Sequence, residues 1–138
     1  MTTTMTRQLL ALIWMCVVAT AAAAKPACYD PKDAQDEMEC LSAEMDKAGK
    51  QLADYLGAAK ARIAADQIKG IKLDAAQAEW LRYRTAHCRD VYQYWIDGTY
   101  RDRASAQCVL DLTRARTRDI WSAYLTYVDS TPPLRPEP

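Results

Sequence analysis

The stretch from Gln77 to Cys108 constrains the fold of this 138-residue chain more than any other. Gly98 lies at its centre, with Cys88 ten residues before it and Cys108 ten residues after it. If two helices meet at Gly98, both cysteines lie about 15 Å from the bend, because a helix rises about 1.5 Å per residue. Cysteines at equal heights whose side chains point inward can bridge the two helices. The spacing therefore predicts a disulfide-locked helical hairpin centred near Gly98.

The composition favours helices in the rest of the chain as well. Half of the residues are apolar, many of these are alanine, and phenylalanine is absent. No run of β-branched residues is long enough to predict a strand. The length suits one domain of ordinary size. We predict an all-α fold, a small bundle of three main helices braced by disulfides.

Residues 1–24 have the three-part pattern of a secretory signal peptide. Arg7 precedes the apolar run Leu9–Ala19, and Ala21–Ala24 supplies the small residues of a cleavage site. The apolar run is short for a membrane span, so a retained anchor is the weaker alternative. We predict cleavage after Ala24, or after Ala23, and a periplasmic or secreted protein without a membrane anchor after cleavage.

Four cysteines remain after cleavage, namely Cys28, Cys40, Cys88 and Cys108. An even number of cysteines in an exported chain predicts two disulfides. Four cysteines allow three pairings, and the sequence alone does not choose between them. The hairpin geometry favours Cys88–Cys108, which leaves Cys28–Cys40.

The first helix has two competing starts, at Asp30 followed by Pro31 or at Asp33 with Asp36 three residues later. A bridge between Cys28 and Cys40 favours Asp33, because the earlier start carries Cys40 too far along the helix. An apolar stripe at helical spacing then runs to about Ala65. Its members are Ala34, Met38, Leu41, Met45, Ala48, Leu52, Tyr55, Ala59 and Ile63.

The second helix is predicted from about Ala75 to Trp95, with Asp74 and Gln77 forming a capping box. Its inner face carries Trp80, Arg84, Cys88, Val91 and Trp95. We interpret Arg84 as a paired structural arginine whose stem packs on Trp80.

The third helix is predicted to start between Thr99 and Asp102 and to end before Thr131. Its predicted inner face consists of Cys108, Leu112, Ala115 or Arg116, Ile120, Ala123 and Tyr127. The helical domain would then span residues 25–130. We expect the proline-rich tail, residues 131–138, to be extended and disordered.

The charge of the chain is zero overall but uneven. Residues 30–54 contain eight acidic and three basic residues, whereas residues 82–118 contain eight arginines and four aspartates. Two interpretations are open: the first helix packs against the hairpin with complementary charge, or one face is presented to a charged partner.

Enzyme, metal and cofactor chemistry find little support in the sequence. His87 is the only histidine, and it points about 100° away from its helix neighbour Cys88, so the two do not form a catalytic pair. No CxxC, second histidine or phosphate-binding loop is present. Export and the near-zero charge argue against nucleic acid as a partner. We therefore predict a protein that is not an enzyme, with no cofactor.

The hairpin tip is the best candidate for binding a partner. It combines tyrosine, tryptophan and arginine, the residues enriched at binding hot spots, and a covalent brace lowers the entropic cost of presenting them. Packing in the core is the alternative role for such a cluster. The candidate partner-binding residues are Tyr94, Trp95, Asp97, Tyr100, Arg101 and Arg103.

A set of motif residues is arranged in order around Cys88, the turn and Cys108, namely Gln77, Trp80, Tyr83, Arg84, Gly98, Thr99, Thr113 and Arg116. This ordered set resembles the LprI-like lysozyme-inhibitor domain. The resemblance extends from about Cys28 to Ile120 and includes the four cysteines. One departure is Leu52-Ala53-Asp54-Tyr55, where family members often carry Leu-Asn-x-x-Tyr.

The resemblance implies an exported bacterial protein that binds and inhibits a lysozyme. Lysozymes act through two carboxylates in a cleft, and residues 97–103 would enter that cleft, with an arginine of the tip meeting the carboxylates. The acidic first helix would then face the basic rim of the enzyme. The alternative is an envelope adaptor that binds another periplasmic protein or peptidoglycan without inhibiting lysozyme.

Overall fold

The computed structural model describes Cys28 and residues 32–138, so the predicted signal peptide lies outside the described residues. Three long helices dominate the described chain: α1 (Ala34–Ala65), α2 (Leu73–Tyr94) and α3 (Arg101–Ile120). A short π-helical turn, η1 (Trp121–Leu125), continues α3. The described residues contain no strand. The predicted all-α bundle with a helical hairpin is confirmed.

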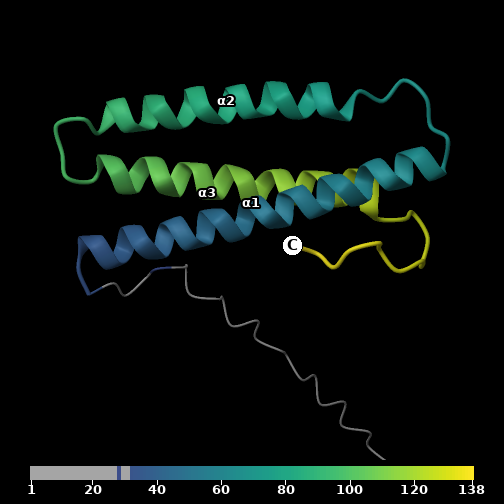
Figure 1. Ribbon diagram of the computed structural model, residues 1–138, viewed down its shortest axis with the longest axis horizontal. Helices are drawn as coiled ribbons and strands as arrows, with labels where there is room; N and C mark the ends of the chain where they lie inside the picture. The colour runs from purple at the N-terminus through teal and green to yellow at the C-terminus, as the bar shows by residue number, and fades with distance from the viewer. Residues whose placement is uncertain (1–27, 29–31) are drawn as a thin grey trace, which may run out of the picture.

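Helix α3 is the central element of the bundle. Figure 1 shows it between α1 and α2, and it packs against both of them. Its buried residues form one stripe at helical spacing, Ala106, Leu110, Thr113, Thr117 and Ile120, and Ala104 is buried on the other side of the helix.

The predicted inner face of α3 was therefore only partly right. Ile120 is buried and Cys108, Leu112 and Arg116 are half-buried, but Ala115, Ala123 and Tyr127 are exposed. The single face expected from the spacing of apolar residues belongs to a helix with one neighbour. A helix with two neighbours also buries small and hydroxyl-bearing residues between them.

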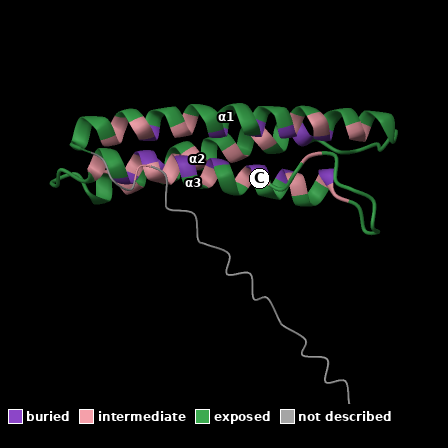
Figure 2. Cartoon of the chain, turned by 90° about the horizontal axis from the view of Figure 1, so that it is seen from below, coloured by how far each residue is buried: buried purple, intermediate pink, exposed green. Residues whose placement is uncertain are grey.

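The apolar stripe of α1 supplies much of the core. Leu41, Ala48, Leu52, Tyr55 and Ala59 are buried, and Figure 2 shows these positions along the face of α1 that meets the rest of the bundle. Ala34 begins the stripe but is exposed, because it lies in the first turn of the helix. Each fully buried leucine contributes about 1.5–3 kcal/mol relative to an exposed one.

The prediction of the start of α1 is confirmed, whereas the prediction of the start of α2 is not. Asp33 caps α1 as predicted, and its carboxylate accepts a hydrogen bond from the backbone N–H of Asp36 at 2.9 Å. The cap at Asp74 was wrong: α2 begins at Leu73, and Lys72 precedes it without a side-chain cap. Leu73 is buried, so its burial favours an earlier start, and Asp74 lies in the first turn, paired with Lys60.

The C-terminal tail differs from the disordered segment expected. The helical part of the chain ends at Leu125, and the tail is extended but lies against α1 and η1 (Figure 1). Tyr55 donates its hydroxyl hydrogen to the carbonyl oxygen of Pro136 at 2.7 Å. Trp121 donates its indole N–H to the carbonyl oxygen of Arg135 at 2.9 Å. The tail therefore satisfies polar atoms of two largely buried aromatic side chains.

Candidate functional site

The hairpin tip, residues 94–103, is the turn between α2 and α3 together with the ends of both helices. Gly98 donates its backbone N–H to the carbonyl oxygen of Trp95 at 3.0 Å and closes the turn. The turn lies where the sequence predicted it. Gly98 is not in the left-handed region, which Gly70 occupies in the loop between α1 and α2.

The aromatic rings of the tip form an exposed cluster. Trp95 packs edge to face against both Tyr94 and Tyr100, with ring centroids 5.2 Å apart in each pair. Tyr94 is 81% exposed, Trp95 43% and Tyr100 42%. The rings hold one another in place, and each still presents a large part of its area to solvent. Ile96, 38% exposed, adds an apolar side chain that the sequence analysis did not include.

The arginines of the tip are already engaged within the protein. Arg101 donates from Nη1 to the carbonyl oxygen of Ile96 at 3.0 Å, and its guanidinium lies 5.9 Å from the Tyr92 ring. Arg103 forms an ion pair with Glu37 of α1 at 2.7 Å. Both arginines therefore have partners within the protein, whereas the rings of Tyr94, Trp95 and Tyr100 remain partly exposed.

A groove of about 330 Å³ separates the tip from the first turns of α1. It brings an acidic, a basic and an aromatic side chain together at one end of the bundle. Its lining consists of Ala34, Glu37, Met38, Thr99, Tyr100, Asp102 and Arg103. Asp97 lies in the exposed part of the turn, outside this lining.

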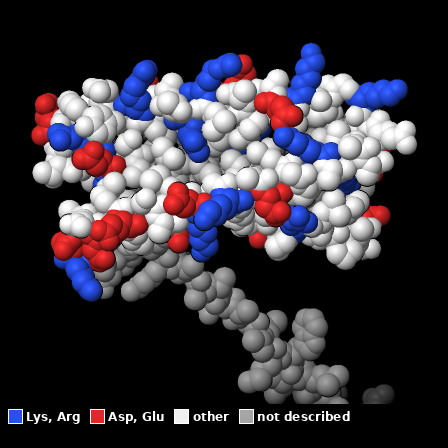
Figure 3. Space-filling view, viewed as in Figure 1, with Lys and Arg blue, Asp and Glu red and all other residues white. Residues whose placement is uncertain are grey.

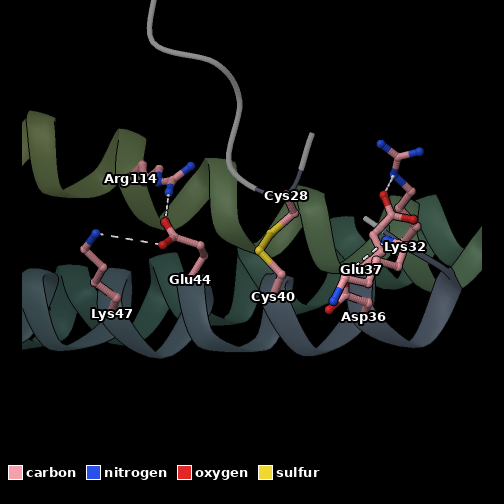
Figure 4. The surroundings of a disulfide bond; sticks show 9 residues. Cys28, Lys32, Asp36, Glu37, Cys40, Glu44, Lys47 and Arg114 are labelled. Carbon is pink, nitrogen blue, oxygen red and sulfur yellow. Dashed lines mark hydrogen bonds and ion pairs between the residues drawn. A yellow bond between two sulfur atoms is a disulfide. The ribbon is translucent and has the colours of Figure 1, made fainter. Parts of the chain in front are cut away.

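Two disulfides brace this end of the molecule, in the predicted pairing. Cys88 and Cys108 join α2 to α3, with Cα atoms 5.6 Å apart. Cys28 and Cys40 join the lead-in segment to α1, with Cα atoms 5.8 Å apart (Figure 4). Of the two, the Cys88–Cys108 bond joins the helices that carry the tip and therefore limits how far they can separate.

Ion pairs between α1 and α3 account for part of the uneven charge. Arg103 pairs with Glu37, and Arg114 pairs with Glu44, which also lies 3.8 Å from Lys47. Figure 4 shows Glu44 between Arg114 and Lys47. The complementary-packing interpretation of the two charged regions is thus supported for these pairs. The acidic side chains in the first turns of α1 that remain exposed include Asp33, Asp36 and Glu39.

Five of the eight motif residues form a contact between α2 and α3. Trp80 lies between two guanidinium groups, with Arg84 at 5.1 Å and Arg116 at 5.9 Å from the ring. Arg84 donates to the hydroxyl oxygen of Thr113 at 2.9 Å, and Arg116 donates to the side-chain oxygen of Gln77 at 3.1 Å. Burial lowers the pKa of Arg84 from its ordinary value. These five residues hold the hairpin together along its length.

The other three motif residues lie elsewhere. Tyr83 is exposed on α2 and stacks on His87, with ring centroids 5.5 Å apart. Gly98 and Thr99 belong to the turn at the tip. Within the described chain, no cluster of three or more histidine, cysteine, aspartate or glutamate residues is suited to holding a metal ion.

A protein-family model described as "Lysozyme inhibitor LprI" matches residues 28–120. The chain belongs to this family. The match begins at Cys28 and ends at Ile120, so it includes both disulfides and all three long helices. The tail that packs on Tyr55 lies beyond the matched residues.

Comparisons with curated proteins and with solved structures found no match. No helix in the described part of this LprI-family chain is long and apolar enough to cross a membrane.

Proposed function

We propose that this protein is an exported inhibitor of a lysozyme and that it acts by protein–protein contact through the hairpin tip. Membership of the LprI family supports the inhibitory role. Two disulfides fit a periplasmic or secreted location, because such bonds persist in oxidising compartments.

The exposed aromatic cluster is the main reason for proposing the hairpin tip as the surface that contacts the enzyme. Tyr94, Trp95 and Tyr100 present rings to solvent from a turn that a disulfide braces. Aromatic anchors of this kind supply most of the binding energy in many interfaces. A braced tip also loses little conformational freedom on binding. The rings, with Ile96, would cover or enter the substrate cleft of the enzyme.

Charge at this end of the molecule fits a cationic enzyme. Figure 3 shows acidic side chains gathered near the start of α1, on the same end of the bundle as the tip. Glu37 and Glu44 are largely neutralised by arginines of α3, so the exposed carboxylates of Asp33, Asp36 and Glu39 would provide the attraction. Such charge raises the rate of association more than the final affinity.

The test is a lysozyme cell-wall-lysis assay with the triple variant Tyr94→Ser, Trp95→Ser, Tyr100→Ser. Loss of hot-spot rings should weaken inhibition by about 30-fold or more. The matched control is Tyr83→Ser, which removes an exposed ring from the side of α2 and should leave inhibition unchanged. Arg101 is left intact because it holds the carbonyl oxygen of Ile96.

Three outcomes are informative. Full inhibition by the folded triple variant would remove the tip from the mechanism. Equal losses in the triple variant and the control would point to a general effect of removing tyrosines. If the wild-type protein inhibits no lysozyme but captures one stoichiometric partner from periplasmic extract, the adaptor role replaces the inhibitor role.

A further inference from the structure

The loop between α1 and α2, residues 66–72, lies at the end of the bundle opposite to the hairpin tip (Figure 1). Ile68 is 49% exposed and Ile71 is 39% exposed, although both are large apolar residues. They stand over a groove of about 440 Å³, whose walls include the apolar side chains of Ile63 and Leu73. This end of the molecule therefore carries an apolar strip with an open groove beneath it.

Backbone hydrogen bonds to α1 fix the start of the loop. Ile68 donates its N–H to the carbonyl oxygen of Ile63 at 3.1 Å, and Gln67 donates to that of Ala64 at 3.2 Å. Gln67 has a φ of 53°, so the helix ends in a Schellman arrangement with a left-handed residue after its last turn. Gly70 has a φ of 86° and turns the chain again. Ile68 is thus fixed against the end of α1, and Ile71 follows the second left-handed residue.

Basic side chains surround the isoleucines. Residues 60–74 contain four cationic residues, Lys60, Arg62, Lys69 and Lys72, and two acidic ones. Both acids are already ion-paired, Asp66 with Arg62 and Asp74 with Lys60. Among the described residues, Lys69 and Lys72 form no ion pair.

We infer that this loop binds the surface of an anionic lipid bilayer. Ile68 and Ile71 would enter the boundary between headgroups and acyl chains, and Lys69 and Lys72 would contact lipid phosphates. Two exposed isoleucines beside two lysines without ion pairs in the described chain, in the order Ile68-Lys69-Gly70-Ile71-Lys72, suit a negatively charged lipid surface, which accepts both apolar side chains and cations. The contact is peripheral and reversible, unlike a spanning or covalently attached anchor.

The inference goes beyond the inhibitory role and does not depend on it. The two surfaces lie at opposite ends of the long axis of the bundle (Figure 1), so a bilayer-bound molecule would point its aromatic tip away from the membrane.

The test is co-sedimentation of the protein, purified from the periplasm after export, with large vesicles. One set contains equal parts of phosphatidylglycerol and phosphatidylcholine, and the other contains phosphatidylcholine alone. The wild-type protein should bind the anionic vesicles and bind the neutral ones much more weakly. In the variant Lys69→Gln, Lys72→Gln the partition should fall about 25-fold, because each lysine near an anionic surface contributes roughly fivefold.

The variant Ile68→Ser, Ile71→Ser tests the apolar contribution and should reduce the partition at least about tenfold. Ile96→Ser is the matched control, since it removes a similarly exposed isoleucine from the opposite end, and it should bind as the wild type does. Helical circular dichroism establishes that each variant is folded. Absence of binding to anionic vesicles, equal binding to neutral vesicles, or unchanged binding by either loop variant would overturn the inference. Saturable capture of a protein partner through these isoleucines, without vesicle binding, would overturn it in favour of a protein interface.

Discussion

Arg84 lies on the inner face of α2 with a hydroxyl group and an indole ring as partners, and no carboxylate of the described residues is paired with it. The hydroxyl of Thr113 accepts from Arg84 and donates to the carbonyl oxygen of Val109 at 2.7 Å. A hydrogen bond to a charged group contributes about 1.5–3 kcal/mol, and a half-buried guanidinium without its partner is costly.

We predict that Thr113→Val lowers the free energy of unfolding by about 1–2 kcal/mol through the loss of the Arg84 hydrogen bond. Thr117→Val is the matched control, because Thr117 is also buried on α3 but bonds only the carbonyl oxygen of Thr113. The control should cost about 0.5 kcal/mol or less. Urea denaturation measures the free energy of unfolding of both variants. Equal decreases in the two variants would show that the hydrogen bond between Arg84 and Thr113 does not stabilise the protein.

For single residues, the sequence predicted some side-chain contacts and missed others. The neighbourhood of Arg84 and Trp80 followed from their spacing, but the guanidinium, where the stem was expected, lies over the ring at 5.1 Å. Its hydroxyl partner could not be chosen, because Thr113 and Thr117 look alike until the orientation of α3 is known. Glycine was also an incomplete guide, since Gly98 marks the turn without a left-handed φ, whereas Gln67 adopts one.

The hairpin of α2 and α3 is the element on which the proposed site is built. Only Leu73 and Cys88 of α2 are buried, so α2 depends on the disulfide and on the contacts of Trp80 to stay against α3. The bond between Cys88 and Cys108 closes a segment of 20 residues. Removing a disulfide of that span costs roughly 3 kcal/mol.

We predict that Cys88→Ala, Cys108→Ala lowers the free energy of unfolding by roughly 3 kcal/mol and also weakens inhibition, because the tip loses its brace. The control is Cys28→Ala, Cys40→Ala, whose bond closes a segment of 12 residues at the start of α1. It should lower stability by a similar amount and affect inhibition less. The comparison is made at a temperature where both variants are folded, and a larger loss of inhibition in the control would contradict the role given to the hairpin brace.

The elements themselves were largely predictable because their signals are local. The apolar stripe and the cap at Asp33 gave α1 with its observed bounds. The start of α2 was misplaced, because the burial of Leu73 depends on packing against the rest of the core. The central position of α3 was likewise missed, since spacing within one helix does not reveal how many neighbours it has.

The whole molecule includes the tail that the sequence suggested would be disordered. Arg135 forms two hydrogen bonds to the carboxylate of Asp54, at 2.8 and 3.0 Å, and Leu134 donates its N–H to the carbonyl oxygen of Leu125 at 2.8 Å. The residues that the tail contacts on α1 and η1 lie far from it in the sequence, so the composition of the tail could not reveal these contacts.

We predict that deleting residues 131–138 lowers the free energy of unfolding by about 1–3 kcal/mol, because Tyr55 and Trp121 lose hydrogen-bond partners. Deleting Pro138 alone leaves the acceptor carbonyl groups of Arg135 and Pro136 intact and should change stability by about 0.5 kcal/mol or less. Thermal and urea denaturation provide the measurement. A full deletion as stable as the wild type would show that the tail packs without stabilising the bundle.

The contact between the tail and α1 should also make the stability of the protein depend on pH. The hydrogen bond from Arg135 lowers the pKa of Asp54 below its ordinary value of 3.8. The unfolded chain therefore binds a proton at a higher pH than the folded chain does, and stability falls as pH drops below about 4. Asp54→Asn should remove this part of the acid sensitivity. Because the pair is exposed, the effect should be small and should weaken further at high salt.

The central claim is that the protein inhibits a lysozyme through its disulfide-braced tip. The most direct measurement is titration of the oxidised protein into a lysozyme cell-wall-lysis assay, with the reduced and alkylated protein as the control. We predict dose-dependent and saturable inhibition by the oxidised protein and its loss after reduction. Absence of inhibition of every lysozyme class at excess oxidised protein would contradict the claim.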